Sequence, residues 1–165
     1  MQISKATKRI LIILIVVLNI GCDQISKITV RKTVTPNDYI ALISDNFILT
    51  NVENTGAMLG FGENLPPTLK IILLQVLPVL VLVVLLYRTL LKTELNNVLI
   101  IAFSFIIGGG IGNLIDRILY GSVTDFFWIK AGILKTGIFN MADVSVTVGT
   151  VLILYISFRY KNIAL

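Results

Sequence analysis

The hydrophobic positions of this chain gather in long blocks, and the stretches between them are richer in polar residues and turn formers. A helix needs about 20 mainly apolar residues to cross the core of a bilayer. Four blocks approach that length, and they cover residues 8–27, 68–87, 96–115 and 141–158. We expect each block to form one membrane-spanning helix, and residues 1–165 to form a single integral membrane domain.

The composition agrees with a membrane-embedded chain. Hydrophobic residues make up 56% of the chain and charged residues 14%, and the mean hydropathy is +0.92, which places the chain among integral membrane proteins. There is no histidine, and Cys22 is the single cysteine, so neither an internal disulfide nor a conventional zinc site is expected. We expect no metal and no other cofactor, although the composition leaves carboxylate-bound magnesium open.

The first block also has the features of a cleaved signal peptide. Basic residues precede its cleanest apolar run, residues 10–20, and Cys22 follows soon after, as in a lipoprotein signal. Such a signal requires an aliphatic residue three positions before the cysteine, and Asn19 occupies that position. The sequence therefore favours a retained first helix.

The distribution of charge predicts how the helices are oriented. If the amino terminus lies inside, the inner segments hold seven basic residues and one acidic residue, and the outer segments hold seven basic and eight acidic residues. The inner basic residues lie in short tails and one tight loop, where the positive-inside rule applies best. We therefore expect both termini in the cytoplasm. The net charge of +5 then reflects contact with anionic lipid headgroups, and no nucleic acid partner is expected.

On this topology the two long connections, residues 28–67 and 116–140, both lie outside. Residues 45–53 have the pattern of an extended strand, while residues 126–129 and 137–139 are short aromatic and β-branched segments that could pair with it. A small sheet on the bilayer surface is one interpretation. The other is an aromatic belt at the membrane interface, which many membrane proteins have whatever their function.

Glycines are concentrated in the third block. Gly108, Gly109, Gly110 and Gly112 fit no dinucleotide-binding fingerprint and follow no strand. Gly108 and Gly112 lie about one helical turn apart, and small residues at this spacing let two membrane helices approach closely. We expect the third helix to pack closely on a neighbour through these two positions.

Three aspartates carry the candidate chemistry. Asp116, Asp125 and Asp143 each lie beside an apolar block, and carboxylates near hydrocarbon are costly and therefore interpreted as functional by default. Without histidine, two carboxyl groups are the most available acid/base pair. Two adjacent carboxyls share a proton, so one can activate water while the other donates to the substrate. The pattern indicates a membrane-embedded aspartyl hydrolase that forms no covalent intermediate.

The choice of the two partners remains partly open. Asp125 lies in an apolar setting that would raise the pKa of a lone carboxyl, and Asp143 is the candidate partner. Asp143 also has a structural interpretation, because Asn140 could cap the fourth helix with Asp143 in its first turn. Spacing alone does not choose Asp125 over Asp116 as the second member.

Further polar residues lie at the outer ends of the helices. Asp23 and Lys27 are four residues apart and share a helix face, an arrangement that is more often structural than catalytic. Asn113, Asp116 and Arg117 fall within about one turn, where a buried aspartate and arginine would favour each other's charged forms.

Three other classes of function compete with the aspartyl hydrolase. A serine hydrolase using Ser26 and Lys27 is disfavoured, because adjacent helical side chains point apart. A small transporter would also use intramembrane carboxylates, yet the acidic residues cluster toward one face of the membrane. A non-catalytic scaffold would tolerate replacement of Asp125 or Asp143 by asparagine.

Five short blocks in a fixed order carry a resemblance to a known family. They are Asp23-Gln-Ile-Ser-Lys27, Asn54-Thr-Gly56-Ala57, Gly112-Asn113-Leu-Ile-Asp116-Arg117, Gly121-Ser-Val123-Thr-Asp125-Phe126 and Phe139-Asn140-Met-Ala142-Asp143. In this order among four spans, the chain resembles the bacterial lipoprotein signal peptidases, also called signal peptidase II. The match covers nearly the whole chain. It departs from the family at Met58-Leu59, where relatives more often carry small and aromatic residues.

The resemblance implies both a fold and an activity. The fold is membrane α-helical, a four-transmembrane-helix bundle with an extracytoplasmic β-cradle, in the bacterial cytoplasmic (inner) membrane. The activity is that of an aspartic endopeptidase, with Asp125 and Asp143 as the catalytic pair. Its substrates are prolipoproteins whose lipobox cysteine carries a diacylglyceryl group, and the cut falls immediately before that cysteine.

The resemblance also implies supporting roles and partners. The residues that would shape the pocket or hold the substrate backbone or its lipid are Asp23, Lys27, Asn54, Gly56, Asn113, Arg117 and Asn140, with Asp116 supporting Arg117. The expected partners are diacylglyceryl-prolipoproteins and membrane lipid, and we expect the chain to act as a monomer.

Overall fold

The computed structural model describes residues 4–57, 60–92 and 95–159, so the departure at Met58-Leu59 lies outside the described residues. All four predicted spans are helical and are long and apolar enough to cross a membrane, which makes this a multi-pass membrane protein. They are α1 (Lys5–Thr33), a second span built from α2 (Pro67–Ile71), η2 (Ile72–Val76) and α3 (Leu77–Leu91), then α4 (Asn97–Tyr120) and α5 (Met141–Arg159).

The second span contains a π-helical turn. In η2 the chain departs from the α-helical pattern, and the Leu77 N–H donates to the Ile72 carbonyl five residues earlier. Pro78 follows directly and has no N–H of its own to donate to the Leu74 carbonyl. Gln75, within η2, donates from Nε2 to the Arg117 carbonyl at 3.2 Å and so joins the second span to the end of α4.

Helix α4 is the centre of the bundle and packs against α1, α3 and α5. A methyl group on Gly108 would lie 2.7 Å from Asn19 Cβ, and one on Gly112 would lie 2.6 Å from Asp23 Oδ2. Both contacts are with α1. The expected close packing through these two glycines is therefore confirmed, and the neighbour is the first helix.

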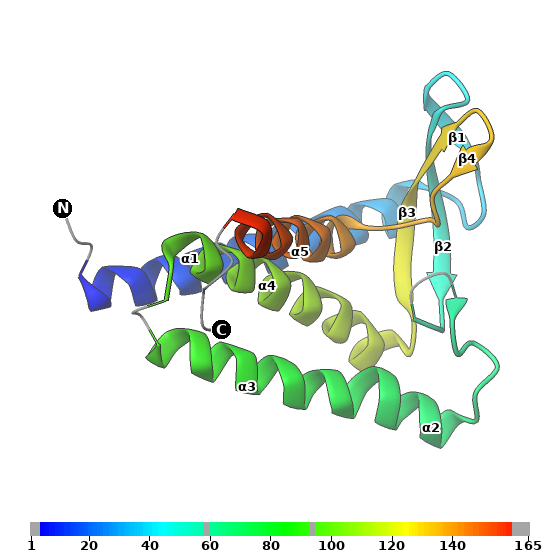
Figure 1. Cartoon of the computed structure of the whole chain (residues 1–165). Coiled ribbons are helices and arrows are strands. Elements are labelled where there is room, and N and C mark those ends of the chain that lie inside the picture. The colour runs from blue at the N-terminus through cyan, green and yellow to red at the C-terminus, as the bar shows by residue number, and fades with distance from the viewer. Residues whose placement is uncertain (1–3, 58–59, 93–94, 160–165) are drawn as a thin grey trace.

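The strands form one antiparallel sheet of order β1-β2-β3-β4 at one end of the bundle (Figure 1). They are β1 (Ile40–Ile43), β2 (Phe47–Asn54), β3 (Val123–Ala131) and β4 (Leu134–Lys135). The predicted strands at 45–53 and 126–129 are confirmed as β2 and β3. Residues 137–139 form no named strand, and only Phe139 makes an isolated bridge, to Phe127.

The sheet interpretation is confirmed, and the aromatic belt is wrong for Phe126. Phe126 is fully buried and packs with Val30 and Val34, at the carboxyl end of α1. The core between α1 and the sheet thus takes up an aromatic side chain that composition alone would have placed at the lipid boundary.

The end of the bundle away from the sheet holds the starts and ends of several helices (Figure 1). Arg9, near the start of α1, donates from Nε to the Leu90 carbonyl near the end of α3 at 3.1 Å. At the opposite end, Gly121 adopts a left-handed conformation with φ of 75° and ends α4, so that the chain enters β3 two residues later. This turn brings Asp125 to the carboxyl end of α4.

Candidate active site

Asp143 lies in the first turn of α5, where it and Asn140 cap the helix reciprocally. The Asp143 N–H donates to Asn140 Oδ1 at 3.0 Å, and the Asn140 N–H donates to Asp143 Oδ2 at 3.1 Å. This is the geometry of a capping box, with aspartate in the position usually taken by glutamate. The structural interpretation of this pair is therefore confirmed, and it leaves Asp143 Oδ1 for another partner.

Asp125, on β3, is the most buried member of the candidate pair, with 4% of its surface exposed. Asn54 Nδ2 donates to its Oδ2 at 3.0 Å, and Asn140 Nδ2 donates to its Oδ1 at 2.6 Å. Burial raises the pKa of Asp125 to about 6; the hydrogen bond from Asn54 opposes this rise, and the nearby charge of Asp143 adds to it. The carboxyl is thus held where its proton can be exchanged near neutral pH.

Two side-chain amides connect Asp125 to Asp143. Asn140 Nδ2 donates to Asn113 Oδ1 at 3.2 Å as well as to Asp125. Asn113 Nδ2 donates to Asp143 Oδ1 at 2.9 Å. The structure thus brings together β3, α4 and α5 at one point, and the two candidate carboxyls belong to one hydrogen-bond network.

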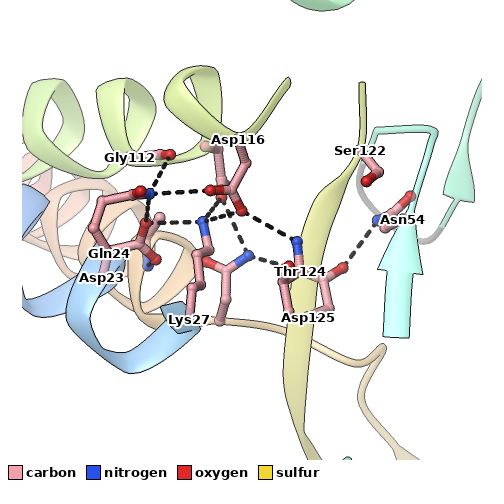
Figure 2. Close-up of polar contacts among 12 residues, drawn as sticks. Asp23, Gln24, Lys27, Asn54, Gly112, Asp116, Ser122, Thr124 and Asp125 are labelled. Atoms are coloured by element: carbon pink, nitrogen blue, oxygen red, sulfur yellow. Dashed lines mark hydrogen bonds and ion pairs between the residues drawn. The ribbon is translucent and has the colours of Figure 1, made fainter. Parts of the chain in front are cut away.

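Lys27 contacts this network and sets the orientation of the Asn113 amide. Its ammonium is fully buried and contacts Asn113 Oδ1 at 2.8 Å. It also pairs with Asp23 Oδ2 at 2.8 Å and with Asp116 Oδ2 at 3.3 Å (Figure 2). Because lysine can only donate, the oxygen of Asn113 must face Lys27, and its NH₂ group then faces Asp143. Asp23 and Lys27, which share a helix face, pair with each other and belong to a larger buried cluster.

Asp23 and Asp116 hold the helices around this cluster. Asp23 Oδ1 accepts the Ala142 N–H at 2.9 Å, which links α1 to the first turn of α5. Asp116 is fully buried and pairs with Arg31 Nη2 at 2.8 Å as well as with Lys27. Its carboxylate thus contacts α1, and it also accepts the Thr124 N–H of β3 at 3.2 Å. The expected support of Arg117 by Asp116 stays a prediction.

Arg117 instead holds the loop after β2. Its Nη2 donates to the Gly56 carbonyl at 2.5 Å, and the Gly56 N–H donates to Asn54 Oδ1 at 2.9 Å. A methyl group on Gly56 would lie 2.6 Å from the Gly60 carbonyl oxygen, so the close turn of this loop requires glycine. The loop thereby directs the NH₂ group of Asn54 toward Asp125.

Both candidate carboxyls line one cavity of about 780 Å³. Arg117 and Asn113 contribute polar groups to its wall, and most of the remaining wall is apolar. The apolar lining comes from the second span, α4, the segment before α5, and α5 itself, and it includes Leu73, Leu74, Pro78, Leu114, Ile138, Phe139, Val144, Val146 and Val148.

The serine alternative does not agree with the geometry. Ser26 Oγ donates to the Asp23 carbonyl of its own helix at 2.7 Å. The contacts of Lys27 are with Asn113 and two aspartates, so the two groups form no nucleophile and base pair.

Sequence reasoning missed four polar residues that surround this site. Arg31, Glu53 and Thr124 interact on the side of the sheet away from Asp125, and Gln24 bonds both Asp23 and Asp116 at 3.1 Å. A signal was available for two of them, because Glu53 and Thr124 directly precede Asn54 and Asp125 in the sequence.

The bundle and the site define a multi-pass membrane protein with the carboxyl chemistry of an aspartic peptidase. The sequence profile described as signal peptidase (SPase) II matches residues 14–159. A lipoprotein signal peptidase of Clostridioides difficile (strain 630) is 39% identical over 149 residues, covering 90% of this chain and 95% of that protein. One of Clostridium tetani (strain Massachusetts / E88) is 36% identical over 143 residues, covering 86% of this chain and 88% of that protein.

A solved membrane enzyme has a similar fold. A bacterial membrane enzyme determined by the in meso method at 2.3 Å resolution has a TM-score of 0.78 and 30% identity to this chain, and the match covers 93% of each. The chain belongs to the signal peptidase II family and is a membrane protease.

Proposed function

We propose that this protein removes signal peptides from prolipoproteins, with Asp125 and Asp143 as its catalytic pair. The observation that carries this assignment is that both carboxyls line one cavity and are joined through the amides of Asn113 and Asn140. The two lipoprotein signal peptidases described above support the substrate class.

The environments of the two carboxyls suggest how they divide the work. Asp125 is the more buried group, and its raised pKa of about 6 favours the protonated form relative to an ordinary carboxyl. Asp143 is only partly buried, and it accepts N–H donors from Asn113 and Asn140. Asp143 takes a proton from the attacking water while Asp125 donates its proton to the scissile carbonyl oxygen, which gives a diol intermediate. Asp125 then takes a proton back from the diol as the C–N bond breaks, and Asp143 donates its proton to the leaving nitrogen.

The scissile carbonyl oxygen gains negative charge before the proton transfer from Asp125 is complete, so a donor beside it would stabilise the transition state. Arg117 lines the same cavity as the two carboxyls and can supply such a donor, while the NH₂ groups of Asn54 and Asn140 are bonded to Asp125 and hold that carboxyl in place. Donors fixed in a site with little water stabilise a developing oxyanion without reorganising during the reaction. Arg117 would thus stabilise the developing oxyanion, while Asn54 and Asn140 position Asp125.

The apolar part of the cavity suits the lipid of the substrate. A diacylglyceryl group on the cysteine holds the substrate at the membrane boundary, and binding energy from its chains places the preceding peptide bond beside the pair. Figure 1 shows the sheet at one end of the bundle, and the polar network includes Asn54 of β2 and Asp125 of β3. We assign that end to the extracytoplasmic face of the inner membrane, with both termini in the cytoplasm.

The chain is also proposed to act as a monomer in contact with membrane lipid. This proposal is supported by the position of both carboxyls in the wall of one cavity within a single copy of the described residues.

The test uses the purified chain in lipid bilayers and a synthetic prolipopeptide, with and without the diacylglyceryl group. We expect cleavage immediately before the modified cysteine, read from the mass of both products. The unmodified peptide should be cut at least about 100-fold more slowly, because the lipid supplies the positioning energy. Equal cleavage of both peptides, or a cut elsewhere, would contradict the proposed substrate class.

A further inference from the structure

A second polar cluster lies on the opposite side of the β2–β3 pair from the cavity. We call it the clamp, and it consists of Arg31, Glu53, Ser122 and Thr124. Thr124 Oγ1 donates to Glu53 Oε1 at 2.6 Å and accepts from Arg31 Nε at 2.7 Å. Ser122 Oγ donates to Glu53 Oε2 at 2.5 Å. The clamp thus joins α1, β2 and β3 through one fully buried hydroxyl, that of Thr124.

The clamp and the site share the same two strands. Glu53 and Thr124 are paired across the β2–β3 ladder, and each is followed in the chain by a site residue, Asn54 and Asp125. Successive residues of a strand point to opposite faces. Figure 2 shows Asp125 next to Thr124 on β3, with Asn54 reaching Asp125 from β2. Fixing Thr124 and Glu53 on one face therefore fixes the Asn54–Asp125 hydrogen bond on the other.

The clamp is also anchored to the buried cluster around Lys27. The Thr124 N–H donates to Asp116 Oδ2 at 3.2 Å, and Arg31 Nη2 pairs with the same oxygen at 2.8 Å. The Arg31 guanidinium also stacks 4.2 Å from the centre of the Tyr120 ring. The direct Arg31–Glu53 ion pair is long, at 3.9 Å, and Glu53 is 46% exposed, so this pair contributes little by itself. The Thr124 hydroxyl is the main link.

We propose that Thr124 and Glu53 are positioning residues for Asp125, acting through the clamp and making no contact with substrate. The inference rests on the proposed catalytic role of Asp125. In this proposal the hydrogen-bonded hydroxyl of Thr124 holds the neighbouring Asp125 in place, in addition to the packing of the buried strand.

The test compares variants that change only the hydroxyl. Thr124→Val keeps the shape and the β-branched backbone preference but removes both hydrogen bonds, and Thr124→Ser keeps them. Thr50→Val is the matched control, because Thr50 is a fully buried threonine of β2 whose hydroxyl has no hydrogen-bond partner among the described residues. Stoichiometric binding of a non-cleavable diacylglyceryl lipopeptide measures the folded fraction, and kcat is expressed per binding-competent molecule.

We expect Thr124→Val to lower this kcat about 10- to 100-fold with KM changed less than about threefold, since a small displacement of a reacting group costs this much. Thr124→Ser should restore it to near wild type, and Thr50→Val should leave it unchanged. Glu53→Ala should also lower kcat. The double variant with Thr124→Val should have a kcat no lower than that of the more impaired single variant, because both substitutions break the same link.

Three outcomes would overturn the inference: an unchanged kcat per binding-competent molecule in Thr124→Val, a serine variant as impaired as the valine one, or additive losses in the double variant. Asp125→Asn, measured alongside, separates this failure from that of the proposed function. If Asp125→Asn remains active, the proposed function fails; if it is inactive while Thr124→Val is fully active, only the positioning inference fails.

Discussion

Asn140 and Asp143 each accept the other's backbone N–H, at 3.0 and 3.1 Å, across the first turn of α5. The capping interaction and the proposed catalytic role are therefore compatible in one residue. Capping occupies Asp143 Oδ2, while Oδ1 faces Asn113 in the wall of the cavity. The cap therefore fixes the Asp143 carboxyl through one oxygen and leaves the other oxygen at the cavity.

This relationship predicts that capping and catalysis can be separated at Asp143. Glutamate is the usual residue at this position of a capping box, so Asp143→Glu should keep α5 capped and change stability by less than about 1 kcal/mol. The longer side chain displaces the carboxyl, and the rate should fall at least about 100-fold. Thermal unfolding and turnover of the same preparation provide the check. A fully active glutamate variant would show that the position of this carboxyl is unimportant.

The pH dependence of turnover should respond to Asn54. The amide of Asn54 donates to Asp125 and favours its ionised form, so it holds the pKa of Asp125 below the value that burial alone would give. Asn54→Ala should therefore raise that pKa and move the alkaline limb of the pH–rate profile to higher pH, because Asp125 acts in its protonated form. Asn46→Ala, in the turn just before β2 and away from Asp125, serves as the control. A shift toward lower pH would contradict the assigned role.

Gly112 and Gly21 form a matched pair for testing the α1–α4 contact. A methyl group on Gly112 would lie 2.6 Å from Asp23 Oδ2, whereas one on Gly21 has no atom within 4 Å. Gly112→Ala should cost about 1–3 kcal/mol by overpacking and should disturb the Asp23–Lys27 pair. Gly21→Ala should be neutral or slightly stabilising, because alanine favours a helix. Unfolding in detergent measures both, and equal effects would be inconsistent with the close contact.

Lys27 should matter more for stability than an ordinary surface lysine. It is fully buried between Asp23 and Asp116, so Lys27→Met leaves Asp23 without its cation and should cost about 3–5 kcal/mol. Lys32→Met, at an exposed position of the same helix, should change stability by less than about 0.5 kcal/mol. The double variant with Asp23→Asn should recover part of the loss. A lack of recovery would mean that the buried charge of Asp23 is not the cause.

Much of the fold was predictable because hydrocarbon imposes a simple length requirement. The four apolar blocks predicted all four spans, and the spacing of Gly108 and Gly112 predicted a close helix contact. Helix ends were less predictable: α1 continues to Thr33, six residues past the predicted end, because Arg31 and the buried Val30 pack against the sheet and α4. Strand β1 was missed because all of its residues are exposed and its pattern does not alternate.

The network around the site was only partly predictable. Sequence spacing reveals contacts within one helix, such as Asp23 with Lys27, and the cap of Asn140 with Asp143. It does not reveal that Asp116 pairs with Arg31 from another helix. Spacing alone also left open the choice between Asp116 and Asp125, and the resemblance implied Asp125. The coordinates support that choice, because Asp116 pairs with two cations while Asp125 lies in the wall of the cavity.

The most direct test of the account is the single-turnover cleavage rate of a diacylglyceryl prolipopeptide by Asp125→Asn and by Asp143→Asn. Both variants should still bind the lipopeptide and should lose at least about 100-fold in rate, since each removes one half of a shared-proton pair. Asp38→Asn, at an exposed position outside the site, should cleave at the wild-type rate. If either site variant cleaves as fast as the wild type, the two carboxyls are not the catalytic pair.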